Sequence, residues 1–313
     1  MNASDISTVA VIGAGTMGAG IAGEFARAGC RVRLNDMNEE LLERGMGIVL
    51  SAQDALVQEE LISRRSVAAA MKRIETKTDL AAACDRVELL VEAVPEDLAL
   101  KKKMFVEFDT LCPKTAILAT NTSGLSITKI AAATKRPTRV VGMHFWNPPH
   151  VIPLVEVTKG ESTSDTTARR LVALCRRIGK KPILVRHDVP GFVGNRLQFA
   201  VLREALHILS EGIASAEDID TAMTAGPGLR WGVIGPLRTA DLGGLDVFSA
   251  ISKYLFRELN SKVRPPAALT DLVDKGKLGA KSGAGFYKYP PEEKERILRR
   301  RDSLLLRMLK LIS

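Results

Sequence analysis

The sequence predicts an α/β fold, with a Rossmann-type doubly wound, mostly parallel sheet followed by a C-terminal all-helical domain. Short β-branched runs alternate with amphipathic stretches over the first part of the chain, a pattern typical of βαβ units. A glycine-rich turn, Gly13 to Gly18, follows the first of these runs. After Asp188-Val189-Pro190-Gly191 no further β-rich run occurs. We therefore expect an α/β domain over residues 1–188 and a helical domain over 189–313.

The strands of the sheet are expected where β-branched and aliphatic residues cluster in short runs. These runs are Thr8–Ile12, Arg31–Asn35, Val87–Val94, Ala116–Thr120, Val140–His144, Leu154–Thr158 and Pro182–Arg186. Between them, apolar residues at helical spacing predict helices at Met17–Ala28, Lys101–Leu111 and Thr166–Ile178. The charged helical pattern over Glu39–Arg73 is longer than one crossover needs and predicts a projecting helical hairpin.

The second domain is expected to consist of helices separated by glycine and proline turns. Asn195–Leu209 is apolar on most sides, which predicts a buried helix or an interface helix. Gly235–Leu259 is also expected to be buried over much of its length.

The composition is that of a soluble globular protein, with 46% hydrophobic and 26% charged residues. No apolar run approaches the roughly 20 residues that a membrane span needs, so we expect a cytoplasmic protein with no membrane partner. The four cysteines lie far apart and form no C-x-x-C pair, and neither a metal site nor a disulfide is expected from them.

The net charge of +9 gathers in two segments. Arg64–Lys77 holds five basic residues against one acidic residue, and Lys288–Ser313 holds eight against four. Solvated helix faces account for both segments, whereas the alternative for the first is a landing site for an anionic substrate tail. No nucleic-acid partner is expected, because the basic segments lack interleaved aromatic residues and no base-reading motif is present.

The turn Gly13-Ala14-Gly15-Thr16-Met17-Gly18 has the G-x-G-x-x-G spacing of a dinucleotide site. Gly13 permits the tight turn, Gly15 lets the backbone approach a pyrophosphate, and Gly18 lets the helix pack closely on the strand. Asp36 ends the second strand 18 residues after Gly18, where a carboxylate accepts from ribose hydroxyls. Because Met37 and Asn38 supply no cation for a 2′-phosphate, NAD is the predicted cofactor.

Polar residues follow three later strands, whose ends face the ligand crevice of an open α/β sheet. Asn121-Thr122-Ser123 follows one of them, and His144 stands at the end of the next. Oxidation of an alcohol needs a base for the hydroxyl proton, and His144 is the candidate, with Glu156 fixing its tautomer. Ser123 and Asn195 are candidates to hold the reacting oxygen. Each of these residues also has a purely structural alternative. His144 could be hydrogen-bonded within the fold without a catalytic role, Glu156 could face solvent on an edge strand, and Asn195 could only cap a helix.

These motifs together resemble the L-3-hydroxyacyl-CoA dehydrogenase family, in order and over nearly the whole chain. The motifs that carry the resemblance are the glycine turn with its aspartate, Asn121-Thr122-Ser123, His144-Phe145-x-Asn147-Pro148, Leu154-Val155-Glu156-Val157, Pro190-Gly191-Phe192-Val193-x-Asn195-Arg196 and Lys281-Ser282-Gly283-x-Gly285-Phe286-Tyr287. The resemblance implies an NAD-dependent dehydrogenase of fatty acid metabolism that interconverts a 3-hydroxyacyl-CoA, such as 3-hydroxybutyryl-CoA, and its 3-oxoacyl form.

The resemblance also implies roles for individual residues and an assembly. His144 and Glu156 are the implied catalytic pair, and Ser123 and Asn195 contact the substrate oxygen. The implied cofactor site comprises Gly13, Gly15, Thr16, Met17, Gly18, Asp36, Glu96, Lys101, Asn121 and Ser123. The implied substrate contacts are Ser123, Asn147 and Asn195. The second domain of this family usually forms a homodimer interface.

Two segments depart from the fatty-acyl members of the family. Trp146-Asn147-Pro148-Pro149-His150 and the longer turn Gly228–Pro236 are more similar to relatives that act on small free acids. Those relatives include L-gulonate 3-dehydrogenase, also called lambda-crystallin, carnitine dehydrogenase and a pyridine-carboxylate dehydrogenase. Arg230 could clamp a free carboxylate, or it could serve an interface or a helix cap. The alternatives are therefore a free-acid dehydrogenase and a catalytically silent crystallin-like protein.

Overall fold

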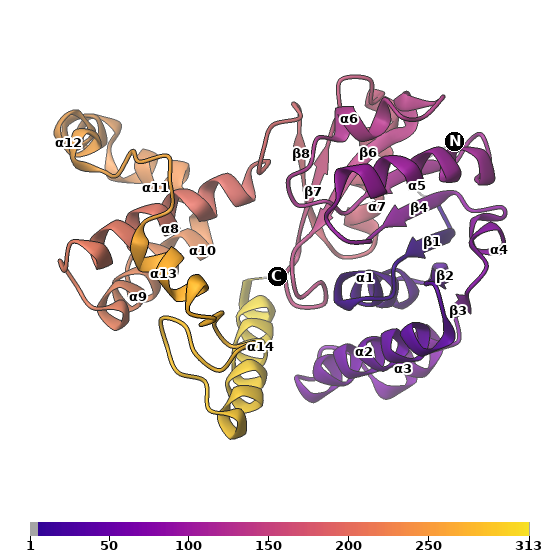
Figure 1. Cartoon of the computed structure of the whole chain (residues 1–313), viewed down its shortest axis with the longest axis horizontal. Coiled ribbons are helices and arrows are strands. Elements are labelled where there is room, and N and C mark those ends of the chain that lie inside the picture. Colours follow the sequence, from indigo (N-terminus) through magenta and orange to yellow (C-terminus); the bar gives the residue numbers. More distant parts are fainter. Residues whose placement is uncertain (1–5, 313) are drawn as a thin grey trace. The chain divides into compact units, whose positions relative to one another are not determined.

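The computed structural model of the protein describes residues 6–312 (Figure 1). The described chain divides into two compact units. Unit one contains the residues up to Arg196 together with Leu305–Lys310, and unit two contains Leu197–Leu304 and the residues after Lys310. Among residues 6–312, no helix combines the length and the apolar character that crossing a bilayer demands.

Unit one is built on one sheet. Its strands are β1 (Thr8–Ile12), β2 (Arg31–Asn35), β3 (Ile74–Lys77), β4 (Leu89–Glu92), β5 (Ile117–Thr120), β6 (Val140–Phe145), β7 (Leu154–Thr158) and β8 (Lys181–Val185). They lie in the order β3-β2-β1-β4-β5-β6-β7-β8. All neighbouring strands are parallel except β6 and β7, which pair antiparallel. The order from β3 to β6 is that of a doubly wound dinucleotide-binding sheet, so the predicted fold class is confirmed.

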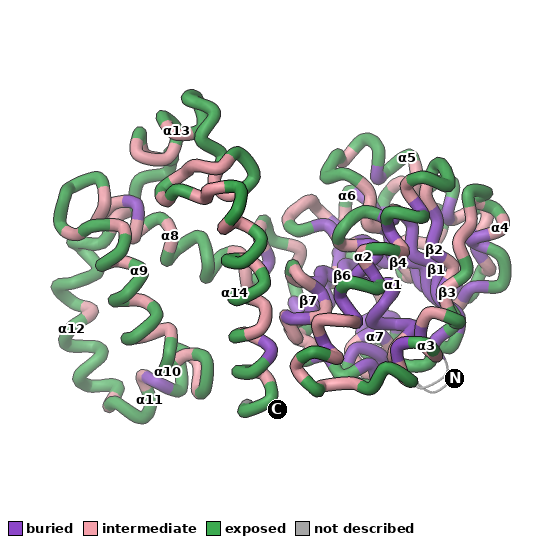
Figure 2. Tube along the Cα trace, turned by 90° about the horizontal axis from the view of Figure 1, so that it is seen from below, coloured by how far each residue is buried: buried purple, intermediate pink, exposed green. Residues whose placement is uncertain are grey.

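Helices cover both faces of the sheet in unit one (Figure 1). They are α1 (Thr16–Arg27), α2 (Glu39–Gln58), α3 (Arg64–Met71), α4 (Leu80–Cys84), α5 (Leu98–Leu111), α6 (Ile127–Ala131) and α7 (Asp165–Arg177). Alternate residues of β1 point to opposite faces. Val9 and Val11 belong to the core that α1 and α7 cover, while Ala10 and Ile12 belong to the core that α5 and α6 cover. Figure 2 shows the central strands of the sheet largely in purple, the colour of buried residues.

The one strand that the sequence did not predict is β3. It has the sequence Ile-Glu-Thr-Lys, its residues are half-buried or exposed, and it stands at the edge of the sheet. An edge strand covered on few sides needs no continuous apolar run, so it lacks the signal that marks the central strands. The charged stretch before it forms two helices, α2 and α3, as predicted, and their starts are capped by Asn38 and Ser63. The expected projection from the sheet is wrong, because both helices pack against α1.

Unit two is helical, as predicted. Its helices are α8 (Gly194–Ser210), which begins in unit one, α9 (Ala216–Ala225), α10 (Pro227–Ile234), α11 (Pro236–Gly243), α12 (Leu245–Glu258), α13 (Ala267–Asp274) and most of α14 (Pro291–Ile312). Near its end α14 returns to unit one, where Leu306 packs with Leu56 and Val151. Arg307 forms an ion pair with Glu59 there, with 2.9 Å between Nε and Oε2.

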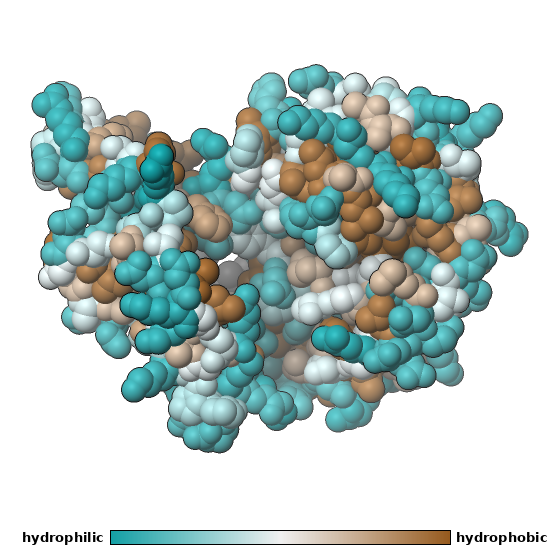
Figure 3. All heavy atoms as spheres, in the orientation of Figure 1, coloured by the Kyte–Doolittle hydropathy of each residue, from teal (hydrophilic) through white to brown (hydrophobic). Residues whose placement is uncertain are grey.

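The expected burial of Gly235–Leu259 is wrong, and of the two alternatives for Asn195–Leu209 burial within the chain is wrong, while an interface helix stays a prediction. Within Leu197–Leu304, Leu206 and Thr239 are the buried residues, whereas large apolar side chains of α8 and α12 such as Phe199 and Phe256 are 58% and 70% exposed. Apolar side chains lie among hydrophilic ones on the surface that Figure 3 presents. An apolar helix face indicates that something covers it, but not whether the cover comes from the same chain.

Candidate active site

The glycine turn between β1 and α1 leaves room for a phosphate. Gly13 has φ +98°, and a Cβ atom there would lie 2.8 Å from the carbonyl oxygen of Ala93. A Cβ at Gly18 would lie 1.7 Å from the carbonyl oxygen of Gly13, so the helix could not approach the turn with any other residue. Gly15 faces open space, and no side chain caps the start of α1. Free backbone N–H groups at an uncapped helix start are the donors that a pyrophosphate takes.

Asp36, directly after β2, is hydrogen-bonded to the glycine turn. Its Oδ2 accepts a hydrogen bond from the Ala14 N–H at 2.7 Å, and its Oδ1 accepts one from the Met37 N–H at 2.7 Å. Thr16 and Met17 form the first turn of α1. The carboxylate beside the turn suits a ribose, so these residues fit a dinucleotide.

Glu92 and Lys101 form a buried ion pair that the sequence analysis did not predict. Glu92 ends β4, and its Oε1 lies 2.5 Å from Nζ of Lys101, both side chains being almost fully buried. Thr120 and the Val94 N–H donate to the same carboxylate at 2.6 and 2.8 Å. Nζ of Lys101 also donates to the Val94 carbonyl and lies 3.4 Å from Glu96. Lys101 is thus held by protein acceptors, and its contact with a cofactor stays a prediction.

Glu96 organises the polar turn after β5. Its Oε1 accepts hydrogen bonds from the Thr122 hydroxyl at 2.6 Å, the Ser123 N–H at 2.9 Å and the Ser123 hydroxyl at 3.1 Å. Partial burial raises the pKa of Glu96, but the hydrogen bond from Thr122, the charge of Lys101 and the bonds from Ser123 outweigh it and lower the pKa below its usual value. Glu96 is therefore an anion at neutral pH that fixes the position of Ser123.

The structure brings two further predicted residues to this turn. Asn121 accepts from the Phe145 N–H through Oδ1 at 2.8 Å, which ties the turn to the end of β6. Asn195 donates from Nδ2 to the carbonyl oxygen of Ser123 at 2.9 Å. Ser123 and Asn195, 72 residues apart in the chain, thus lie together at the carboxyl edge of the parallel strands.

His144 and Glu156 form a buried pair in the same region. Nδ1 of His144 lies 2.8 Å from Oε2 of Glu156, and Oε1 of Glu156 accepts from the N–H groups of Val193 and Gly194 at 3.0 and 2.9 Å. Burial raises the pKa of Glu156, but the hydrogen bonds from His144, Gly194 and Val193 outweigh it and hold the pKa below its usual value. Since an ionised carboxylate only accepts, Nδ1 carries the proton and Nε2 of neutral His144 is a base.

Trp146 also contacts the His144–Glu156 pair, a role that the sequence analysis did not predict. Its indole Nε1 lies 3.3 Å from Oε2 of Glu156, and its ring centroid lies 5.5 Å from that of His144. Phe192 contacts the imidazole from another side, with 6.0 Å between the centroids. The departure from the family pattern at Trp146-Asn147 was noted in the sequence, but nothing in a local pattern indicated a contact with Glu156.

The structure leaves the substrate contacts of Asn147 and Arg230 as predictions. Asn147 is exposed and precedes a cis peptide bond to Pro148. Arg230 lies in α10 of unit two and is exposed. The basic segment divides: Lys72 and Arg73 line a cavity of about 500 Å³ together with Thr8, Arg31 and Ile74, the first residues of three parallel strands. That cavity lies at the amino edge of the sheet, whereas His144 stands at the carboxyl end of β6, so we expect Lys72 and Arg73 to lie away from a substrate tail.

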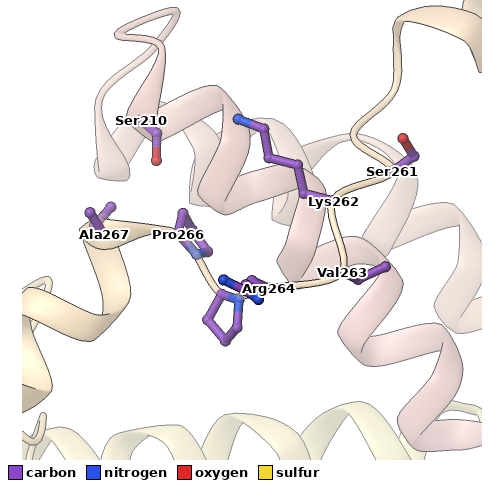
Figure 4. A pocket seen from close by; sticks show the side chains of 9 residues that line it. Ser210, Ser261, Lys262, Val263, Arg264, Pro266 and Ala267 are labelled. Atoms are coloured by element: carbon purple, nitrogen blue, oxygen red, sulfur yellow. The ribbon is translucent and has the colours of Figure 1, made fainter.

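A larger cavity, of about 790 Å³, lies in unit two between the end of α8 and the segment from Ser261 to Ala268 (Figure 4). Its cationic residues, Lys262 and Arg264, stand on an exposed loop. None of the predicted site residues lines it. Over the part of the chain that the structure covers, no group of His, Cys, Asp and Glu residues could hold a metal ion.

Both parts of the chain are similar to domains of known proteins. The sequence models of the NAD-binding and C-terminal domains of 3-hydroxyacyl-CoA dehydrogenase match residues 8–189 and 191–289. A 3-hydroxybutyryl-CoA dehydrogenase of Mycobacterium tuberculosis is 38% identical over 91% of this chain and 99% of its own length. The structure of (S)-3-hydroxybutyryl-CoA dehydrogenase from Ralstonia eutropha is similar at 39% identity, with a TM-score of 0.76 over 91% of this chain and 100% of that one.

A second kind of relative is similar over more of the chain. The 5-formyl-3-hydroxy-2-methylpyridine 4-carboxylate 5-dehydrogenase of Mesorhizobium japonicum is 36% identical over 92% of both chains. The structure of a dehydrogenase of this name has a TM-score of 0.92 over 98% of both chains, at 34% identity. With matches to both domains in order, the chain belongs to the 3-hydroxyacyl-CoA dehydrogenase family of NAD-dependent oxidoreductases.

Proposed function

We propose that the protein interconverts a 3-hydroxyacyl-CoA, such as 3-hydroxybutyryl-CoA, and its 3-oxoacyl form. The observation that carries the proposal is the buried His144–Glu156 pair, with 2.8 Å between Nδ1 and Oε2, at the edge of the sheet where Ser123 and Asn195 also meet. A histidine held in one tautomer by a carboxylate is suited to take a proton from a hydroxyl group and to return it.

In this mechanism Nε2 of His144 takes the proton of the substrate hydroxyl group. Glu156 stabilises the imidazolium that forms, because its negative charge is buried beside Nδ1. The Ser123 hydroxyl and the second N–H of the Asn195 amide hold the substrate oxygen. NAD held at the glycine turn would supply the hydride acceptor for the carbon that bears this oxygen. In the reducing direction His144 returns the proton to the same oxygen.

The proposed cofactor site is the glycine turn with its neighbours. The N–H groups at the start of α1, from Gly15 through Thr16 and Met17 to Gly18, bind the pyrophosphate, and Gly13 makes the turn that presents them. Asp36 accepts from the ribose hydroxyls. Glu96, Lys101, Asn121 and Ser123 line the nicotinamide end, with Lys101 acting through the position of Glu96. Asn147 is proposed to contact the substrate.

We also propose that residues 1–188 form the NAD-binding domain and that residues 189–313 form a substrate and dimerisation domain. Within Leu197–Leu304, Leu206 and Thr239 are the buried residues, which is too small a core for a stable helical unit. A second copy covering the exposed apolar faces of α8 and α12 would complete that core. Sedimentation of the purified protein as a dimer tests this. A cytoplasmic location and a role in fatty acid metabolism are further predictions, tested by cell fractionation and by growth on fatty acids.

A second candidate is a dehydrogenase of a free hydroxy acid or a pyridine carboxylate. The observation that favours it is the presence of helix α14. The family's sequence models stop at residue 289, whereas α14 follows and returns to unit one. The pyridine-carboxylate dehydrogenase structure covers 98% of this chain, compared with 91% for the hydroxybutyryl-CoA dehydrogenase structure. In this alternative, Arg230 binds the free carboxylate.

Initial rates distinguish the two candidates. Acetoacetyl-CoA with NADH is expected to turn over, and a panel of free hydroxy acids with NAD is expected to give low rates. Undetectable turnover of acetoacetyl-CoA beside robust oxidation of a free acid would reverse the choice. The His144→Gln variant, assayed in parallel, shows that the measured rate belongs to this site.

A further inference from the structure

Trp146 donates to the same carboxylate oxygen that holds the proposed catalytic histidine. Its Nε1 and Nδ1 of His144 lie 3.3 and 2.8 Å from Oε2 of Glu156. The indole is half-buried and tilted by 51° against the imidazole, with 5.5 Å between the ring centroids. The tryptophan therefore contacts both members of the pair.

We propose that Trp146 is a positioning residue, whose indole N–H sets how strongly Glu156 stabilises the protonated form of His144. The inference rests on the proposed function of His144 as the acid–base group. Trp146 acts through Glu156 and need not touch the substrate.

The hydrogen bonds of Glu156 support this role by their number. A carboxylate offers about four acceptor positions. Two are taken at Oε1 by the N–H groups of Val193 and Gly194, and two at Oε2 by His144 and Trp146. Glu156 is completely buried, so water is kept from it. Loss of the indole N–H therefore leaves one acceptor position at Oε2 without a donor. His144 is then the remaining hydrogen-bond partner of that oxygen.

The direction of the effect follows from electrostatics. A donor to a carboxylate offsets part of its negative charge, so the indole weakens the attraction between Glu156 and the imidazolium. Glu156 on β7 is the ionised group bonded to His144. From the segments after β6 and β8, uncharged Trp146 and Phe192 face the imidazole. Glu96 faces the turn after β5, bonded to Thr122 and Ser123. Without the indole N–H, Glu156 should hold the proton on His144 up to a higher pH.

The start of α8 makes room for the indole. A Cβ atom on Gly194 would lie 2.3 Å from Cζ2 of Trp146, closer than any real contact. The N–H of the same glycine donates to Glu156. Trp146 and Gly194 thus fit each other around one carboxylate, and a side chain at position 194 must displace the indole.

The first experiment compares Trp146→Phe with the unmodified enzyme in the pH profile of kcat/KM for alcohol oxidation. Phenylalanine keeps an aromatic ring and removes the donor. The acid limb should move to higher pH by about half a unit or more. In the Glu156→Gln background, Trp146→Phe should cause no such movement. An unchanged acid limb, or an equal movement in both backgrounds, overturns the proposal.

The second experiment uses fluorescence and needs no substrate. The chain has two tryptophans, so Trp231→Phe leaves Trp146 as the sole indole emitter. Protonated imidazole quenches a neighbouring indole, and the emission should therefore fall as the pH drops through the acid limb. The transition should vanish in His144→Gln and move to lower pH in Glu156→Gln. Emission that does not change with pH in the Trp231→Phe protein argues against the contact and overturns the proposal.

Gly194→Ala provides a second perturbation should Trp146→Phe fold poorly. It should displace the indole from the carboxylate, so the acid limb of kcat/KM should move to higher pH. In the Glu156→Gln background the same alanine should cause no such movement. An acid limb that Gly194→Ala leaves unmoved contradicts the proposal. Full turnover by His144→Gln would instead refute the proposed function, so the two failures are distinguishable.

Discussion

His144 and Glu156 are direct cross-strand partners in the pair β6–β7, the one antiparallel junction of the sheet in unit one. Cross-strand partners place their side chains on the same face, with Cβ atoms about 4.5–5.5 Å apart. The hydrogen bond of 2.8 Å between them is therefore set by strand register. Because a shift by one residue would turn either side chain to the other face, the fold itself holds the pair together.

Removal of the imidazole tests the role of this pair. In His144→Gln, the loss of the proton acceptor should lower kcat by roughly 10²- to 10⁴-fold, the usual contribution of general acid–base catalysis. The affinity for NADH, measured by fluorescence titration, should remain close to that of the unmodified enzyme because the glycine turn is untouched. Near-normal turnover by the variant would refute the mechanism.

Glu156 should affect both catalysis and stability as the pH changes. Its pKa is lowered in the folded protein, so its ionised form stabilises the fold above the unfolded value of about 4.3, and this stabilisation is lost as the pH falls through that value toward the folded pKa. Thermal unfolding from pH 3 to 8 should therefore show Glu156→Gln less stable than the unmodified protein at pH 7, with a gap that narrows below about pH 4.3.

The activity of Glu156→Gln gives an independent check. Without the carboxylate the imidazolium is less stabilised, so kcat should fall and the acid limb of oxidation should move to lower pH. A variant with an unchanged pH profile would show that Glu156 has only a structural role.

The parts of the fold and site that could be predicted from the sequence carry local signals. β1 and the glycine turn are contiguous in the chain, and a buried strand such as Val-Ala-Val-Ile needs an apolar run. His144 and Glu156 each stand in a short motif at a strand end, so they could be paired before the register of β6 and β7 was known. Each of these features is specified within a few neighbouring residues.

The features that could not be predicted depend on distant segments. The contact between Trp146 and Gly194 joins residues 48 positions apart and depends on the exact start of α8. The buried partner of Lys101 was missed because Glu92 completes a short strand and its role depends on how α5 packs against it. The choice between a buried helix and an interface helix for α8 could not be made from the sequence, since an apolar helix face has the same pattern whether its own chain or a partner covers it.

Asp36 should determine the choice between NAD and NADP. Its carboxylate would repel a 2′-phosphate, so the unmodified protein should have a much higher kcat/KM with NAD than with NADP. Asp36→Ala should reduce this difference. The alanine also removes the acceptor for the Ala14 N–H. Asp36→Asn is the matched control, because it removes the charge and keeps an oxygen for that bond. If the unmodified protein used both cofactors equally, the ribose role of Asp36 would be wrong.

The buried ion pair between Lys180 and Glu24 should contribute strongly to stability. Nζ of Lys180 lies 2.5 Å from Oε2 of Glu24, and the lysine also donates to the carbonyl of Pro149. Lys180→Met leaves Glu24 with Arg27 as its remaining cation and should lower the free energy of unfolding by about 3–5 kcal/mol. Lys180→Met with Glu24→Met should lose less than Lys180→Met alone, because the fully buried carboxylate is removed together with its lysine, and the partly exposed Arg27 keeps contact with water. Denaturant unfolding measures both, and a larger loss in the double variant would contradict this account.

The basic segment offers a matched test of the substrate. Arg64 and Arg65 are the first residues of α3, whereas Lys72 and Arg73 follow its end and line the cavity at the amino edge of the sheet. If the substrate carries coenzyme A, Arg64→Ala with Arg65→Ala should raise KM and flatten its salt dependence. Lys72→Ala with Arg73→Ala removes the same charge and should leave KM unchanged.

Arg230 provides the opposite test. If the substrate is a free acid, both pairs of alanine substitutions in the basic segment should be nearly silent, and Arg230→Leu should weaken substrate binding about ten- to a hundredfold, because a charge-assisted contact contributes on the order of 1.5–3 kcal/mol. The KM for acetoacetyl-CoA and for the best free acid, measured in all three variants, decides between the candidates. A rise in KM caused by the Lys72 and Arg73 pair but not by the Arg64 and Arg65 pair would contradict this expectation, because it would mean that the substrate tail meets the amino edge of the sheet.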